Sequence, residues 1–383
     1  MESSEVKESK GNKGKKENKK IKKSKSKEKE SDKKSKKDKK KGKKKEKERK
    51  SILEFKNPNE TMFLNKKIKL LEGQLKDKTN NFINNNFDIS LKNPIHTLNY
   101  HKNWVLCLSI LNDDRLISGS ADNSIIIYNK TTYQPDLIIN EHKSPINCII
   151  QLNAGILATC SYDKTIKLFN IEGNKYNIIQ TLNNHTCSVN KIIEIENKYL
   201  VSCSDDKSII FYLKDNLKYK KDYQISTNGS CLCINQIKEN EICYSEYANS
   251  KKICFFDINE RKIKSSISNI SISIFSPFIM ISKELLLISG KNEISIININ
   301  YYELIREIEV SNSDWIKAYC MLNKNILFTG DEKGIIREWK IEEDNLILIS
   351  KKENAHNNSI LTLLNIGNEH IVSGSADTLI KIW

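Results

Sequence analysis

Four sets of histidine, serine or threonine, and aspartate are the residues of this sequence best suited to chemistry. In each set the hydroxyl residue follows the histidine by 17 positions and the aspartate follows it by 21. The sets are His101, Ser118 and Asp122; His142, Thr159 and Asp163; His185, Ser202 and Asp206; and His356, Ser373 and Asp377. These residue types are the parts of a nucleophilic triad, in which histidine takes the serine proton. An active site needs one set, so the recurrence favours a structural network and predicts that the protein is not an enzyme.

Other chemical signatures are weak. The chain has no glycine-rich phosphate loop, no HExxH or GxSxG motif and no kinase-like set of motifs. His96 and His370 stand apart from the four sets, and the ten cysteines do not recur with ligand spacing, so we expect no metal and no cofactor. Cys231 and Cys233 are the nearest to a ligand pair, and their spacing predicts two buried thiols on one face of a strand.

Basic residues are concentrated at the N-terminal end. Residues 1–50 hold 25 Lys and Arg against 10 Asp and Glu, whereas the rest of the chain is neutral. With so few apolar residues this segment cannot offset the entropy of ordering, and we predict a disordered Lys-rich arm. Such an arm would attract RNA or an acidic partner without reading base sequence, because it contains no aromatic residue for stacking. Lysine-rich composition from codon bias, or a solubilising tail, is an equally good interpretation.

A linker with one short helix is expected over residues 51–93. Asn57 and Pro58 are typical of a helix start, and apolar residues follow at Leu64, Ile68, Leu71 and Leu75. The pattern predicts a helix over about residues 58–76. It could pack on its own domain or pair with another helix.

Self-similar segments occupy the chain from residue 94 to residue 383. Each reads as a strand, a tight turn and a second strand, as in 118–128 and 373–383. The seven copies end at Tyr128, Phe169, Tyr212, Phe256, Ile297, Trp339 and Trp383, with spacings of 41, 43, 44, 41, 42 and 44 residues. Two further alternating strands fit into each repeat, and four strands per repeat predict an all-β, seven-bladed β-propeller. The last repeat ends at its third strand, and a closed ring needs one more strand. In the WD40-repeat family, which these repeats resemble, that strand comes from the N-terminal end of the propeller. The resemblance therefore implies that residues 94–98 add the fourth strand and close the ring.

These repeats resemble the WD40-repeat family. The resemblance implies that a turn Asp, a His, a Ser or Thr and a Trp form a hydrogen-bonded tetrad inside a blade. The last repeat has all four, as His356, Ser373, Asp377 and Trp383, whereas Tyr or Phe replaces the Trp in the first three repeats. The fourth, fifth and sixth repeats lack the His and the turn Asp, and we predict that their blades are softer.

A binding function is expected for one face of the propeller. The residue before each first strand is Trp104, Pro145, Ser188, Ser230, Phe275, Trp315 or Ser359. Aromatic residues anchor protein interfaces, so this ring predicts a partner site. Its candidate residues are Trp104, Tyr162, Asp205, Phe275, Trp315 and Glu332. The alternative is that these rings pack against neighbouring loops.

The sequence therefore predicts a non-enzymatic scaffold that binds other proteins through this face. An RNA- or ribosome-associated factor that uses the basic arm is one alternative. A substrate adaptor of a ubiquitin ligase is another, although residues 51–93 show no F-box, and likeness to G-protein β subunits is a third. No apolar run is long enough to span a membrane or form a secretory signal, so we expect an intracellular protein, cytoplasmic or nuclear.

Overall fold

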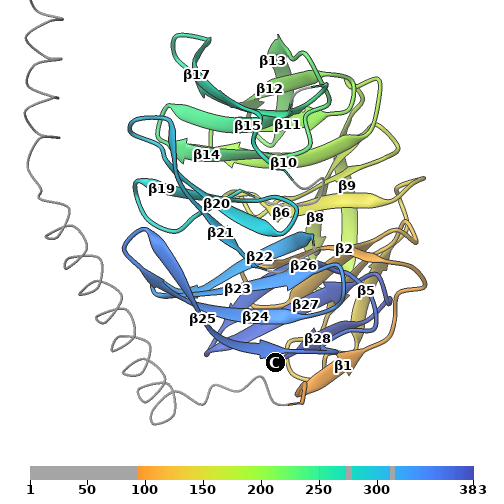
Figure 1. The fold of residues 1–383 in the computed structure, drawn as a ribbon. Helices are drawn as coiled ribbons and strands as arrows, with labels where there is room; N and C mark the ends of the chain where they lie inside the picture. Colours follow the sequence, from red (N-terminus) through yellow and green to blue (C-terminus); the bar gives the residue numbers. More distant parts are fainter. Residues whose placement is uncertain (1–92, 250, 273–277, 311–314) are drawn as a thin grey trace, which may run out of the picture. The chain divides into compact units, whose positions relative to one another are not determined.

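Seven four-stranded antiparallel sheets, arranged as the blades of a propeller, make up the described part of the chain (Figure 1). A computed structural model describes residues 93–249, 251–272, 278–310 and 315–383. These residues form strands β1 to β28 and no helix. The predicted arm over residues 1–50 and the predicted helix over about residues 58–76 lie outside the described residues. The all-β, seven-bladed propeller is confirmed.

The strands follow one another along the chain in blade order. Blades 1 to 3 contain β2 (Val105–Ile110), β3 (Leu116–Ser120), β4 (Ile125–Tyr128), β5 (Pro135–Ile139), β6 (Ile146–Gln151), β7 (Leu157–Ser161), β8 (Ile166–Glu172), β9 (Lys175–Leu182), β10 (Val189–Ile195), β11 (Tyr199–Ser204), β12 (Ser208–Asp215) and β13 (Lys218–Ser226). Blades 4 and 5 contain β14 (Ile234–Lys238), β15 (Glu241–Tyr247), β16 (Lys251–Asp257), β17 (Lys262–Ser268), β18 (Ile279–Met280), β19 (Leu285–Ser289), β20 (Glu293–Asn298) and β21 (Glu303–Glu309). Blades 6 and 7 contain β22 (Ile316–Asn323), β23 (Ile326–Asp331), β24 (Ile336–Glu342), β25 (Asn345–Lys352), β26 (Ile360–Gly367), β27 (His370–Ser375), β28 (Ile380–Ile382) and β1 (His96–Leu98).

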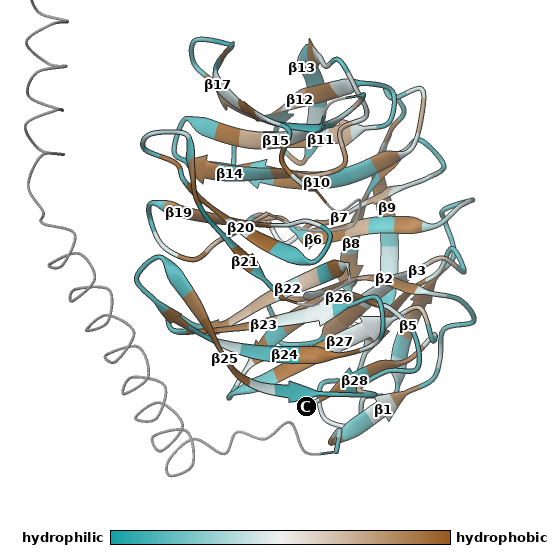
Figure 2. Cartoon of the chain, in the orientation of Figure 1, coloured by the Kyte–Doolittle hydropathy of each residue, from teal (hydrophilic) through white to brown (hydrophobic). Residues whose placement is uncertain are grey.

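Hydrophobic contacts between adjacent blades hold the ring together. The buried residues form seven clusters, and each cluster draws its members from two neighbouring blades. Ile117 of β3 and Phe169 of β8, for example, share the cluster between blades 1 and 2. Figure 2 shows the apolar colour concentrated on strands and the polar colour on connecting loops. The β-branched composition of the middle strands suits this packing between two sheet faces.

Strand β1 closes the ring by pairing with β28 (Figure 1). His96 lies opposite Ile382 and Leu98 opposite Ile380 in an antiparallel register. The backbone N–H of Ile95 extends the ladder by donating to the carbonyl of Ile382 at 2.7 Å. This is the pairing expected for residues 94–98, and it removes two strand edges that would otherwise be unpaired.

Five innermost strands share a register shift near their first residue. The shift occurs in β2, β6, β10, β22 and β26, and the residues within it are Leu106, Asn147, Asn190, Lys317 and Leu361. A bulge of this kind leaves one residue out of the ladder and redirects its side chain. The repeated bulge thus places one residue from each of five blades in equivalent positions.

Cys231 and Cys233 do not lie in a strand, which corrects the sequence prediction. Both thiols are buried as expected, but β14 begins only at Ile234. The hydroxyl of Ser245 accepts the N–H groups of Leu232 and Cys233 at 3.3 and 3.0 Å. The Ser245 side chain thus binds two backbone N–H groups that would otherwise pair with a neighbouring strand.

Candidate functional site

The loops before the innermost strands and the turns between the second and third strands lie together, and we call the face that they form the top face. One backbone hydrogen bond between loop and turn recurs there from blade to blade. In blade 1 the N–H of Ala121 in the turn donates to the carbonyl of Trp104 in the loop at 2.8 Å. The equivalent pairs, donor first, are Tyr162 with Pro145, Asp205 with Ser188, Tyr247 with Ser230, Glu332 with Trp315, and Ala376 with Ser359. In six blades these bonds join the loop before the first strand to the turn after the second strand, or in blade 4 to the last residue of that strand.

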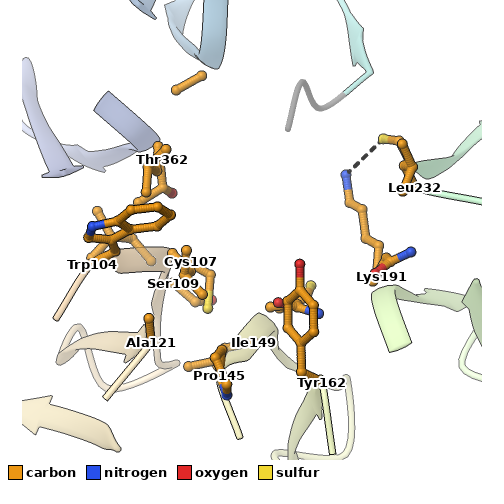
Figure 3. A pocket seen from close by; sticks show the side chains of 18 of the residues that line it. Trp104, Cys107, Ser109, Ala121, Pro145, Ile149, Tyr162, Lys191, Leu232 and Thr362 are labelled. Carbon is orange, nitrogen blue, oxygen red and sulfur yellow. Dashed lines mark hydrogen bonds between the residues drawn. The ribbon is translucent and has the colours of Figure 1, made fainter. Parts of the chain in front are cut away.

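A cavity of about 790 Å³ opens among the innermost strands (Figure 3). Its wall includes Trp104, Tyr162, Asp205 and Lys191. Trp104 and Tyr162 are 47% and 48% exposed, which is unusual for large aromatic side chains. The combination of exposed aromatic groups and an adjacent cavity is typical of a binding site.

A second arrangement of polar residues lies inside blade 7. His356 Nδ1 is 2.9 Å from Asp377 Oδ2, and His356 Nε2 is 2.7 Å from Ser373 Oγ. Trp383 Nε1 donates to the same Ser373 Oγ at 2.8 Å. The carboxylate can only accept hydrogen bonds, so Nδ1 of His356 carries the imidazole proton. Nε2 therefore accepts a hydrogen bond from the Ser373 hydroxyl. The donors therefore run in one direction, from Trp383 through Ser373 and His356 to Asp377.

The surroundings hold these groups in the neutral imidazole and ionised carboxylate forms. Burial lowers the pKa of His356, and the hydrogen bond that its Nδ1 donates to Asp377 only partly opposes this effect. Burial alone would raise the pKa of Asp377, but hydrogen bonds from His356 and from the N–H groups of Asn357 and Leu379 outweigh it and lower the pKa to about 2. The same carboxylate thereby fixes the tight turn and the histidine.

Blades 1, 2 and 3 repeat the arrangement. The histidine lies 2.8 or 2.9 Å from its aspartate and 2.7 or 2.8 Å from its hydroxyl residue. These sets are His101, Asp122 and Ser118; His142, Asp163 and Thr159; and His185, Asp206 and Ser202. Tyr128 takes the place of the Trp in blade 1 and has its hydroxyl 3.1 Å from Ser118 Oγ, whereas Phe169 in blade 2 has no polar group.

The distances within each set match those of a nucleophilic triad, but a substrate could not reach the hydroxyl group. Ser118, Thr159, Ser202 and Ser373 are all 0% exposed. A nucleophile must approach a substrate carbonyl, and a fully buried hydroxyl cannot do so. The geometry therefore supports a structural network that joins loop, turn and strand within a blade.

Blades 4 to 6 fill the same positions differently. The strand register places Tyr244 and Ile288 where Ser118 lies in blade 1. Blade 6 keeps the hydroxyl and the indole, because Trp339 Nε1 donates to Thr329 Oγ1 at 3.0 Å. Its turn is held by Asp331, which accepts the N–H groups of Lys333 and Ile335 at 2.9 Å and binds the buried guanidinium of Arg337.

A comparison with known protein families identifies the repeats in four of the blades. The family model described as "WD domain, G-beta repeat" matches residues 92–129, 134–170, 176–212 and 349–383. The chain is a seven-bladed β-propeller, and four of its blades carry WD40 repeats. The matched segments reach into the third strands of blades 1, 2, 3 and 7, the four blades with the histidine and aspartate network.

Two curated WD-repeat relatives share part of this sequence. The chain is 34% identical over 91 residues to "Actin-interacting protein 1" of Caenorhabditis elegans, which is 23% of this chain and 14% of the relative. It is 34% identical over 83 residues to "Small ribosomal subunit protein RACK1" of Neurospora crassa, which is 20% of this chain and 26% of the relative. The matched part thus spans about a quarter of the second relative and less of the first.

The predicted partner residues of this WD40 propeller separate into two groups. Trp104, Tyr162 and Asp205 line the cavity together. Trp315 and Glu332 are a half-buried pair elsewhere on the top face, where the Trp315 ring lies 5.4 Å from the Lys251 ammonium, and they are not in the cavity wall. Phe275 lies outside the described residues. The expected single patch is therefore only partly assembled.

Sequence reasoning missed the inner wall of the cavity. Asn147, Asn190 and Lys191 lie at or beside the strand bulges, where simple alternation does not place side chains. A polar residue at the second position of successive first strands was the available signal. Within the described ranges, no three His, Cys, Asp or Glu side chains cluster as metal ligands would, and no helix is long and apolar enough to cross a membrane.

Proposed function

We propose that this WD40 propeller is a non-enzymatic scaffold that binds a protein segment at the top face. The observation that carries the proposal is the pair of half-exposed rings, Trp104 and Tyr162, at a cavity of about 790 Å³. Tryptophan and tyrosine supply large apolar area with little loss of side-chain entropy, which suits interface anchors. The backbone of each ring is fixed by the loop-to-turn contact, so binding would not need to order it.

Affinity capture with the full chain tests this proposal. Trp104→Ala with Tyr162→Ala should remove bound proteins that the unaltered chain retains. Tyr301→Ala is the matched control, because Tyr301 is 74% exposed in the turn between β20 and β21 and is not part of the cavity wall. Retention of every bound protein by the double variant would contradict the proposal.

A second candidate is association with RNA or a ribosome through the N-terminal segment. Its support is the excess of 25 Lys and Arg over 10 Asp and Glu in residues 1–50, together with the partial likeness to the ribosomal relative. Binding of this kind weakens steeply with salt, because basic residues displace counterions from phosphates. Exchange of ten lysines in residues 1–50 for glutamine should flatten the salt dependence of RNA binding. An unchanged slope would show that this segment does not contact the RNA phosphates.

A further inference from the structure

Lys191 brings a positive charge into the wall of the cavity. It follows the bulge in β10 and lies opposite Cys203 of β11. By the same register, the equivalent residues of blades 1, 2, 6 and 7 are Cys107, Cys148, Ala318 and Thr362. All of these residues line the cavity, and among them only Lys191 is a basic residue. The charge is therefore a feature of this chain rather than of the repeat.

The ammonium group of Lys191 lacks a carboxylate partner among the described residues. Its Nζ lies 3.7 Å from Cys233 Sγ, the contact drawn as a dashed line in Figure 3. The acidic side chain in the cavity wall, Asp205, accepts a hydrogen bond from Asn190 Nδ2 at 2.9 Å. Burial disfavours the charge on Lys191, but the thiols of Cys233 and Cys148 outweigh this and raise its pKa. A half-buried ammonium group without a carboxylate partner is poorly solvated and would gain from an incoming carboxylate.

The charge and the aromatic rings belong to three consecutive blades. Trp104 is in blade 1, Tyr162 in blade 2 and Lys191 in blade 3. In the view of Figure 3, Tyr162 stands between Trp104 and Lys191. A bound peptide that runs from blade 1 to blade 3 would contact the two aromatic rings first and the Lys191 ammonium group next. A doubly charged phosphate usually recruits arginine or several cations. A single lysine in a wall that also contains Asp205 suits a singly charged carboxylate better.

We propose that the cavity binds a peptide segment that places an Asp or Glu carboxylate at Lys191 and an adjacent apolar side chain on Trp104 and Tyr162. This inference rests on the proposed scaffold function and specifies the chemistry of its partner. Lys191 then acts as a specificity residue, because it leaves a neutral peptide with an unpaired cation beside it.

Selection from a phage-displayed library of random dodecapeptides tests the inference with the full-length protein as bait. The unaltered protein should enrich peptides with Asp or Glu next to an apolar residue. Lys191→Met should lose the acidic preference, Lys191→Arg should keep it, and Lys191→Glu should exchange it for Lys or Arg. For one selected peptide, replacing its acidic residue with the amide should weaken binding about tenfold or more, as expected for loss of a charge-assisted hydrogen bond. Thermal unfolding of each variant checks that the fold is retained.

The outcomes separate this inference from the scaffold proposal. Peptides that need Trp104 and Tyr162 but show no acidic preference would overturn the role of Lys191 and leave the scaffold proposal standing. If no selected peptide depends on the two rings, both fail. A phosphoserine in place of the acidic residue that binds more than tenfold tighter would also overturn the carboxylate assignment.

Discussion

Blades 1, 2, 3 and 7 differ from blades 4, 5 and 6 in their polar interior, although all seven have the same four-stranded topology. The first group joins histidine, aspartate and a hydroxyl residue inside each blade. The second group has no such set among its described residues, yet its apolar clusters with neighbouring blades continue the ring. The comparison teaches that packing between blades determines the architecture, whereas the network is a local reinforcement.

Blade 6 shows that the reinforcement can be built from other residues. Asp331 lies at the end of β23 rather than in the turn proper, and its partner is Arg337 of β24 instead of a histidine in the preceding loop. Gly334 permits this turn to approach blade 7, because a Cβ there would lie 2.1 Å from the carbonyl oxygen of His356. The prediction that blades 4 to 6 are softer thus applies best to blades 4 and 5.

Acidification should give the largest contrast between the two groups, because it acts on all networks at once. The pKa values of His185 and His356 are lowered, so the stability from their neutral forms is complete above about pH 6.5 and declines as the pH falls. The pKa of Asp377 is lowered to about 2, so its contribution is lost between about pH 4 and that value. Burial instead raises the pKa values of Glu293 in blade 5 and Glu338 in blade 6, and protonation there favours the folded state.

Hydrogen exchange followed by mass spectrometry can resolve this effect by blade. Protection factors in blades 3 and 7 should fall between pH 7 and 4 relative to those in blades 5 and 6. Equal loss of protection in every blade would show that the networks do not set the local acid sensitivity.

Removal of single carboxylates should give the next largest effect. Asp331→Ala removes the buried carboxylate that binds the Arg337 guanidinium and should lower the free energy of unfolding by roughly 3–5 kcal/mol. Asp377→Ala should lower it by roughly 2–4 kcal/mol, because its buried partner His356 is neutral. Urea unfolding measures both changes. Asp344→Ala, at an exposed ion pair with Arg306, is the control and should stay within about 0.5 kcal/mol.

Loss of one hydroxyl should give the smallest effect and sharpen the comparison between blades 6 and 7. Thr329→Val removes the acceptor for Trp339 and should cost about 1 kcal/mol. Ser373→Ala removes a group bonded to both His356 and Trp383 and should cost about twice as much. Equal losses in the two variants would mean that the histidine bond adds nothing to stability.

The sequence was informative where one pattern recurs with the period of a blade. The spacing of the seven bulky residues from Tyr128 to Trp383 predicts the number of repeats, and all seven are buried. Closure by residues 94–98 follows from the family resemblance, and the need to pair an edge strand is its physical reason. The His, Ser or Thr and Asp sets recur with a fixed spacing, but only the family resemblance implies that their side chains meet, since spacing alone does not tell which side chains are in contact.

The remaining features depend on local exceptions to the repeat. The Arg337 and Asp331 pair uses positions that the resemblance does not assign. Lys191 was missed because the bulge in β10 shifts the register by one residue and so changes the face of the strand on which a side chain lies. Trp315 was grouped with Trp104 because both precede a first strand, but its ring packs near Lys251 of blade 4.

The register of β1 on β28 has a mechanical consequence. His96 lies opposite Ile382, so the chain leaves both strands at the same end of the pair. Hydrogen bonds in an antiparallel ladder lie perpendicular to the strands. Tension between residues 93 and 383 would therefore pull along these bonds and open them one after another, rather than shear them together. The ring would yield at low force, and this propeller is poorly suited to carry a load between its two ends.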